Sequence, residues 1–488
     1  MAMPDASSPA PRWVALAGLL SLALAPAHAS TFAGPASAEE LLPVPQPEVE
    51  GPIPGSPPGD PLSDVLEETY PFFGSDLDLE ARGYVEEEFF IGGDANVYAD
   101  GEVVSTHPYE TRVVVRRPAK PQRFSGTAFV EWQNVTAGFD LDALWSASAD
   151  HYIRSGYAWV GVSAQNVGVS QLSQWSPRRY GDLDVTDGGT VTGDALSFDI
   201  FSQAALAVRN NTGDIMGGLQ VEQALAIGAS QSAGFMTRYY NDVLPLVEPV
   251  FDGYGYIVGN APAPAEGRTE PIFQVSSETD VIIGLGSAGR GFEQTELFRR
   301  WEVAGTGHSG AAGERARAGV LERDLGPPGP DGCLFGRNGM PLHHVIHAAY
   351  DHLVDWADGG AAPPVADLIE TDAGGAIVRD ELGLAQGGIR LSQIDVPTAV
   401  NHGFNAADPN AEQSSQFCFL FGSHIPADET PVPAFGVGEL DLDRLYRSHG
   451  AYVAAVNRVE KRNVRDGFVV LADSLQNRRE AAQSDIGR

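Results

Sequence analysis

Lysine is almost absent from this chain of 488 residues: it occurs only at Lys120 and Lys461, and arginine supplies nearly all of the 31 basic side chains. The 65 acidic side chains outnumber them and give a formal net charge of −34. A chain with this balance cannot assemble a basic face that neutralises phosphate groups. We therefore exclude a nucleic-acid partner and adsorption to an anionic membrane surface.

Cysteine is also scarce, because the chain contains only Cys333 and Cys418, too few for a small domain held together by disulfides. In an oxidising compartment the two could form one disulfide, and the alternative is two separate buried thiols. After residue 29 no apolar run reaches the roughly 20 residues that a membrane-spanning helix needs. With 43% hydrophobic residues, a chain of this length can nevertheless bury at least one large core.

The first 29 residues have the pattern of a secretory signal peptide. Arg12 precedes an apolar run over 13–25, and the small residues Ala27 and Ala29 form a cleavage site. We expect cleavage directly after Ala29 and a mature protein that is secreted or periplasmic.

Composition divides the rest of the chain into three parts. Residues 30–75 are rich in proline and glycine, as in PVPQPEVEGPIPGSPPGDP, which predicts a flexible leader. Residues 76–310 contain regular strand and helix patterns and predict the core of the protein. Residues 311–488 exceed what that core needs, so we expect them to pack on it and to include a lid over the site.

Within residues 76–310, buried strands alternate with helices. Residues 126–132 and 157–164 are continuous apolar runs, which is typical of strands covered on both faces, and 221–229 is another predicted buried strand. Segments with helical spacing, 139–156 and 194–209, separate these predicted strands. Two strands with alternating polarity precede the series. This order predicts an α/β fold with a mainly parallel central sheet and helices on both faces.

A small-residue segment, GASQSAG, lies between the last of these predicted strands and a predicted helix. It resembles the nucleophile elbow G-x-S-x-G, with Ser232 in place of the second glycine. Such an elbow lifts one hydroxyl clear of the sheet, so the residues around it must be small. We identify Ser230 as the candidate nucleophile. The alternative is an ordinary turn in which Ser230 or Ser232 only caps the helix.

A serine nucleophile needs a histidine base and an acid that orients it. His308 follows the last predicted strand, 299–305, in a glycine-containing loop and is the candidate base. The preceding strand runs directly into Glu278 and Asp280, of which Asp280 takes the position of the usual aspartate. Glu278 remains the alternative acid. The order serine, aspartate, histidine is that of α/β-hydrolases.

Several longer segments resemble one family of large bacterial α/β-hydrolase-domain proteins. They cover nearly all of the mature chain and include GYVEEEFFIGGDANVYA, FVEWQNVTAGFD, GYAWVGVSAQNVGV, GASQSAG, SSETDV, WEVAGTGH, AAYDHLVDWADGGAAPP, GGIRL and CFLFGSHIP. The resemblance implies an α/β-hydrolase fold with a serine-hydrolase site, and it leaves the substrate open.

The elbow geometry also predicts an oxyanion hole. One donor should be the backbone N–H of Gln231, and the other the N–H of Gln133 or Asn134, of which we favour Asn134. Aromatic side chains on or beside this second loop could line a pocket or belong to the core: Trp132, Phe139 and Trp145.

Two segments invite comparison with metal-binding patterns. His343, His347 and Asp351 share one helix face, but the helix lacks the HExxH pattern of zinc enzymes. The acidic run 182–188 fails the register of a calcium-binding loop. We therefore expect no metal and no cofactor.

These patterns together predict an exported serine hydrolase that cleaves a small-molecule or polymeric ester through an acyl-enzyme. An amidase or a lactonase would use the same triad, and a non-catalytic binding protein could share the fold. An intact elbow followed by an acid and a histidine favours the enzyme, because a binding protein needs none of the three.

Overall fold

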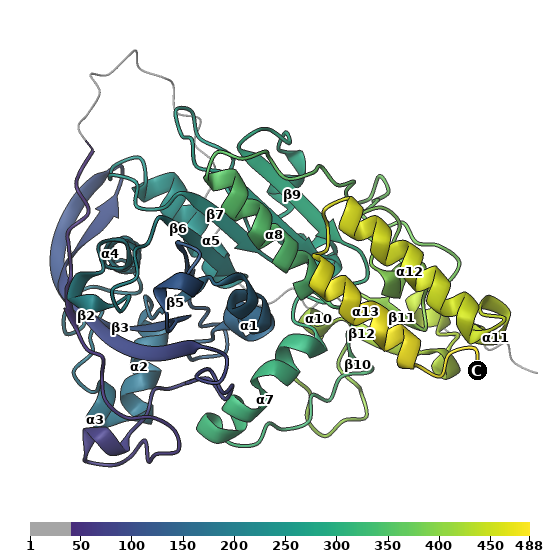
Figure 1. Cartoon of the computed structure of the whole chain (residues 1–488), viewed down its shortest axis with the longest axis horizontal. Coiled ribbons are helices and arrows are strands. Elements are labelled where there is room, and N and C mark those ends of the chain that lie inside the picture. The colour runs from purple at the N-terminus through teal and green to yellow at the C-terminus, as the bar shows by residue number, and fades with distance from the viewer. Residues whose placement is uncertain (1–40) are drawn as a thin grey trace, which may run out of the picture. The chain divides into compact units, whose positions relative to one another are not determined.

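Nine strands form the central sheet of the computed structural model, which describes residues 41–488; the predicted signal peptide and the first part of the predicted leader lie outside the described residues. The strands are β1 (Glu48–Glu50), β2 (Tyr84–Ala99), β3 (Glu102–Pro118), β4 (Thr127–Trp132), β5 (Ala158–Val162), β6 (Gln223–Ala229), β7 (Gly253–Ile257), β8 (Ile272–Ser277) and β9 (Phe298–Val303). Their order is β1-β2-β3-β5-β4-β6-β7-β8-β9 (Figure 1). All neighbours from β5 to β9 are parallel, which confirms the predicted mainly parallel sheet.

Helices cover both faces of this sheet (Figure 1). The helices of the described residues are α1 (Ala143–Ser155), α2 (Asn166–Trp175), α3 (Pro177–Tyr180), α4 (Ser197–Asn210), α5 (Gln231–Arg238), α6 (Glu278–Ile283), α7 (Ala311–Leu325), α8 (Leu342–Ala357), α9 (Ser392–Asp395), α10 (Cys418–Phe421), α11 (Leu442–Leu445), α12 (His449–Arg465) and α13 (Leu471–Gln483). α4 and α5 share a hydrophobic cluster with Ala224 and Ala226 of β6, whereas α1 and α8 share another with Leu225 and Ile227. Side chains alternate across a strand, so cover on both faces explains the continuous apolar run.

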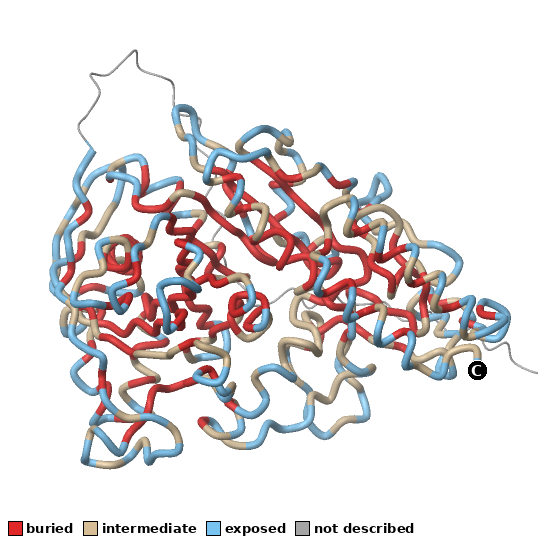
Figure 2. The backbone as a smooth tube through the Cα atoms, viewed as in Figure 1, coloured by how far each residue is buried: buried red, intermediate tan, exposed pale blue. Residues whose placement is uncertain are grey.

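The C-terminal part of the chain shares the second of these clusters. It contains a small sheet in the order β10 (Gly336–Arg337), β12 (Ser423–Pro426), β11 (Ala399–His402). Val345, Val400 and Ile425 from this part pack in the cluster that holds Leu225 and Ile227. Buried backbone continues from the central sheet into this region (Figure 2). The predicted boundary at residue 310 therefore does not separate two cores.

A disulfide closes one loop of the C-terminal part. Cys333, before β10, is bonded to Cys418 at the start of α10, 85 residues later. The structure thus has the pairing rather than the two separate thiols. In residues 41–488, no helix combines the length and the apolar character needed to cross a bilayer.

The predicted flexible leader is wrong for residues 41–75. β1 pairs with β2 in antiparallel register, and Val44 is buried in the core. Phe72 and Phe73 end the segment and are at most 2% exposed. The composition that suggested flexibility supplies extended backbone, and the aromatic residues at its end supply enough apolar surface to hold that backbone against the sheet.

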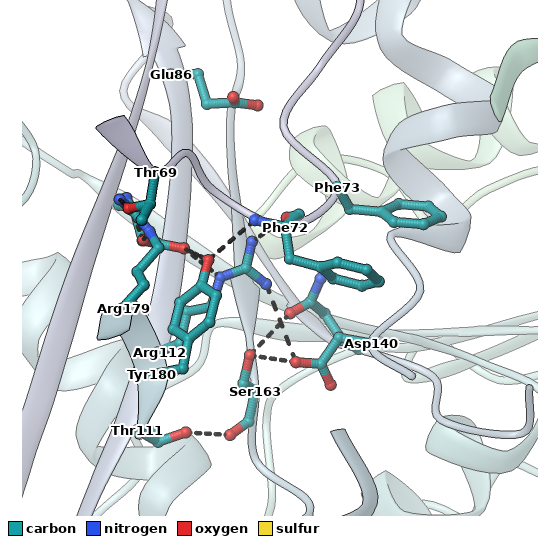
Figure 3. Close-up of polar contacts among 12 residues, drawn as sticks. Thr69, Phe72, Phe73, Glu86, Thr111, Arg112, Asp140, Ser163, Arg179 and Tyr180 are labelled. Carbon is teal, nitrogen blue, oxygen red and sulfur yellow. Dashed lines mark hydrogen bonds and ion pairs between the residues drawn. The ribbon is translucent and has the colours of Figure 1, made fainter. Parts of the chain in front are cut away.

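A buried charge network also holds this segment (Figure 3). Glu88 on β2 accepts hydrogen bonds from Arg112 on β3 at 2.5 Å, from Arg179 at 2.6 Å and from the hydroxyl of Tyr180 at 2.7 Å. Arg112 also donates to the carbonyl of Phe72, whose N–H donates to the Tyr180 hydroxyl. The side chains of Glu88, Arg112 and Arg179 are at most 1% exposed.

We expect Glu88→Ala to lower the free energy of unfolding by about 3–5 kcal/mol, because it leaves two buried guanidinium groups without their carboxylate. Urea unfolding followed by tryptophan fluorescence measures the loss. Glu87→Ala is the matched control: Glu87 pairs with Arg117 and is 32% exposed, so its loss should be about 1 kcal/mol or less. Equal losses in the two variants would contradict a stabilising role for the network.

Candidate active site

Ser230 occupies a strained turn between β6 and α5. Its backbone has φ 58° and ψ −115°. For a residue other than glycine, this conformation costs on the order of 1–3 kcal/mol. Its side chain makes no hydrogen bond that caps α5. Ser230 therefore differs from an ordinary helix cap and has the strand–turn–helix setting predicted for the elbow.

The neighbours of Ser230 keep this turn tight. A Cβ atom at Gly228 would lie 2.6 Å from the sulfur of Met236, so only glycine fits there. Ser232 is fully buried, and its Oγ donates to the carbonyl of Ala229 and accepts from the N–H of Ala229, both at 2.9 Å. The hydroxyl of Ser232 is thus committed to the turn, whereas Ser230 is only half-buried and lines a cavity.

Asp280 and His308 meet at the same edge of the sheet. Asp280 lies in α6 directly after β8, and His308 follows β9, so both lie beyond the carboxyl ends of parallel strands, as Ser230 does. Nδ1 of His308 is 2.6 Å from Oδ1 of Asp280, and the two side chains are 6% and 0% exposed. Oδ2 of Asp280 accepts from the N–H and the hydroxyl of Ser277, which fixes the carboxylate. This carboxylate is placed to orient the imidazole.

Glu278, the alternative acid, contacts other groups. Its Oε2 accepts from the N–H of Gly305 at 2.6 Å, and its Oε1 accepts from Arg379 at 2.7 Å and from the N–H of Gly403 at 2.9 Å. It therefore holds the histidine loop against the C-terminal part instead of contacting His308. The structure favours Asp280, because the helical turn aims residues 278 and 280 in different directions.

Ser230 and His308 line one cavity of about 340 Å³. Within residues 41–488, no hydrogen bond joins them, and Nε2 of His308 forms no hydrogen bond. Catalytic hydrogen bonds are commonly long before substrate binds and shorten in the complex. The free Nε2 is the atom that a general base would use toward the serine.

The backbone N–H groups considered for the oxyanion hole differ in their partners. Gln231 is the first residue of α5, so its N–H has no partner within the helix. The N–H of Asn134, in contrast, donates to Leu141, and the N–H of Gln133 donates to Val162. The next N–H along, that of Val135, donates at 3.5 Å to Oε1 of Gln231, and Asn134 but not Val135 lines the cavity that contains Ser230. Asn134 therefore stays the predicted second donor, and its N–H would have to leave the carbonyl of Leu141 to serve a substrate.

Most of the cavity wall is apolar and comes from two regions. The loop after β4 contributes Phe139 and Leu141, while α7, α10 and the segments beside them supply the facing wall. Leu321, Leu420 and Phe421 belong to that facing wall. Part of the C-terminal region thus covers the site, where a lid was predicted. Of the three aromatic candidates, only Phe139 lines this cavity; Trp132 and Trp145 are buried in the core.

The histidine-rich helix α8 forms structural contacts. His347 Nδ1 lies 2.6 Å from Asp473, and His151 stacks on His347 with ring centres 4.6 Å apart. Burial lowers the pKa of His343 to about 4, so its ring is neutral at pH 7. In the described part of the chain, no group of three histidine, cysteine or acidic side chains could hold a metal ion.

The model of the family described as "Alpha/beta hydrolase domain" (Abhydrolase_10) matches residues 49–479, a range that includes Ser230, Asp280 and His308. Among solved structures, the chain is similar to XC6422 from Xanthomonas campestris, which is described as a member of a/b serine hydrolase without lid. The two are 14% identical over 49% of this chain and 97% of that one, with a TM-score of 0.27. An alpha-beta serine hydrolase homologue from Coxiella burnetii is 13% identical over 44% of this chain and 90% of its own, with a TM-score of 0.27. A thermostable esterase from Pseudomonas putida is 12% identical over 42% of this chain and 66% of its own, with a TM-score of 0.25. No curated protein matches the chain.

Proposed function

The chain belongs to the alpha/beta hydrolase domain family, and from this premise we propose that it is a serine hydrolase that cleaves carboxylic esters. The observation that carries the proposal is the buried contact of 2.6 Å between Asp280 and His308, beside a strained Ser230 that lines the same cavity. A fold that only binds ligands has no need of a backbone strained at one serine.

In the proposed reaction, Oγ of Ser230 attacks the ester carbonyl while Nε2 of His308 takes the hydroxyl proton. Asp280 accepts the hydrogen bond from Nδ1 and stabilises the imidazolium that forms. The N–H groups of Gln231 and Asn134 would stabilise the charge on the carbonyl oxygen, and one such donor is typically worth about 2.7–4 kcal/mol. His308 then protonates the departing alcohol and afterwards activates the water that releases the acid.

The first experiment is covalent labelling with a fluorophosphonate. We expect the protein to gain the mass of one phosphonyl group, and peptide mapping to place it on Ser230, because only an activated serine reacts at an appreciable rate. Hydrolysis of short and long para-nitrophenyl esters is measured in parallel. Ser309→Ala is the control, since Ser309 lines the same cavity outside the triad. Failure to label, together with no turnover of any ester, would reject the proposal.

We also propose that the protein acts outside the cytoplasm. The disulfide between Cys333 and Cys418 supports this location, because such bonds persist in oxidising compartments. The signal-peptide pattern over residues 1–29 supports it independently. Fractionation of cells that express the full chain, followed by N-terminal sequencing, tests both points.

A further inference from the structure

One cation in the active-site cavity has no carboxylate partner. Arg317 lies in α7, on the wall that faces Ser230 and His308, and its Nε donates to the carbonyl of Gly313 at 2.9 Å. Across residues 41–488, its two terminal nitrogens form no ion pair and no hydrogen bond. Gly313 makes room for the guanidinium, because a Cβ atom there would lie 2.8 Å from Nη2 of Arg317.

Arg337, which also lines this cavity, differs from Arg317 because it has carboxylate partners. Arg337 pairs with Glu314 at 2.6 Å and with Asp331 at 2.5 Å, and its guanidinium lies 3.5 Å from the ring centre of Phe421. Arg337 is thus fully engaged as a structural cation. Arg317 has the same charge in the same cavity without these partners.

The three carboxyl groups that act most strongly on the charge of Arg317 are those of Asp142, Glu314 and Glu131, and they are already committed. Asp142 pairs with Arg116 at 2.5 Å, and Glu314 pairs with Arg337. Burial, reinforced by the charge of Asp142, raises the pKa of Glu131 to about 8, so its carboxyl is mostly protonated at pH 7. Burial also lowers the pKa of Arg317 itself, which means that its charge is poorly solvated. An anion beside it would relieve that cost.

Arg317 lines two adjoining cavities. A second cavity of about 280 Å³ shares Ala147, Ala312, Arg317 and His343 with the first, so Arg317 lies at the boundary between the two. A ligand that extends from Ser230 along the apolar wall would bring its far end to this guanidinium. Arginine is suited to that end because its planar fork binds a carboxylate through two hydrogen bonds.

We propose that Arg317 selects substrates whose apolar chain ends in an anionic group, of which a carboxylate is the simplest. The inference deepens the proposed function and rests on it, because the chain must present its ester to Ser230. The net charge of −34 by itself would disfavour anionic substrates. A positive charge at Arg317 would oppose that repulsion inside the cavity.

The test compares para-nitrophenyl monoesters of succinate, adipate and suberate with matched esters in which an isopropyl group replaces the carboxylate. For the chain length that fits, we expect the ratio of kcat/KM, anionic over neutral, to fall about 10- to 100-fold in Arg317→Gln, as for a lost hydrogen bond to a charged group. The loss should lie mainly in KM, since the contact is present in both ground and transition states.

Arg315→Gln is the matched control. Arg315 is exposed on the same helix, so this variant removes an equal charge away from the cavity and should leave the ratio unchanged. A ratio that stays constant in Arg317→Gln, or that falls equally in Arg315→Gln, would overturn the inference. Thermal unfolding of both variants shows whether α7 remains folded.

A binding measurement separates this inference from the proposed function. Calorimetry with monomethyl adipate and with its isopropyl analogue uses Ser230→Ala, with and without Arg317→Gln, and requires no turnover. Weaker binding of the anionic probe alone in the double variant supports the role of Arg317 even if no ester is hydrolysed. Unchanged binding rejects that role even if the neutral esters are good substrates.

Discussion

Ser230→Ala is expected to lower kcat for ester hydrolysis by about 10⁴- to 10⁶-fold, the range found when the nucleophile of a serine triad is removed. The proposed reaction has no other route to an acyl-enzyme, because the nearby hydroxyl of Ser232 is committed to Ala229. Steady-state kinetics with a para-nitrophenyl ester measure the change, and loss of the fluorophosphonate label should accompany it.

The same variant should remain folded, and its stability should change little. Alanine removes the hydroxyl but keeps the strained backbone, so Ser230→Gly is the informative partner. Glycine adopts φ 58° without penalty, and we expect it to raise the free energy of unfolding by about 1 kcal/mol relative to alanine. Activity retained within tenfold in Ser230→Ala would show that Ser230 is not the nucleophile.

Asp280→Asn is expected to lower kcat by about 10⁴-fold while KM changes little. The amide can donate to Nδ1 of His308, which would turn the imidazole into the tautomer that cannot accept the serine proton. The pH dependence of kcat/KM distinguishes this from misfolding: activity should partly recover at high pH, where hydroxide can replace the base.

Glu278→Gln is the companion variant. Its oxygens accept hydrogen bonds from Gly305, Arg379 and Gly403, and the amide nitrogen of glutamine cannot accept. We expect a loss of stability, on the order of 1–3 kcal/mol, and a much smaller loss of kcat per folded molecule than in Asp280→Asn. The reverse ranking of kcat would make Glu278 the acid.

The parallel sheet could be predicted because its strands are buried on both faces, which leaves runs such as 224–229 apolar at every position. The packing of residues 41–75 could not be predicted from the sequence. Proline and glycine disfavour regular structure wherever they occur, so their abundance conceals a segment that Phe72 and the buried carboxylate of Glu88 hold in place. The hydrogen bond from the N–H of Phe72 to the hydroxyl of Tyr180 joins positions 108 residues apart. Local composition therefore cannot indicate it.

The candidate site could likewise be predicted only in part from the sequence. The elbow, the acid and the base each follow a strand, so topology alone brings Ser230, Asp280 and His308 to one edge. The choice between Asp280 and Glu278 depended on side-chain direction over a single helical turn. Arg317 had no signal at all in the sequence, because nothing in α7 indicates which of its arginines faces a cavity.

The contacts of Glu278 have a consequence for biosynthesis. The loop that carries His308 is held through Glu278 by Arg379 and Gly403, which lie 101 and 125 residues further along the chain than Glu278. A polypeptide that has left the ribosome only as far as residue 370 contains the nucleophile, the acid and the base, yet neither of these two partners. While the chain is incomplete, the contacts that hold the histidine loop in the finished structure therefore cannot form.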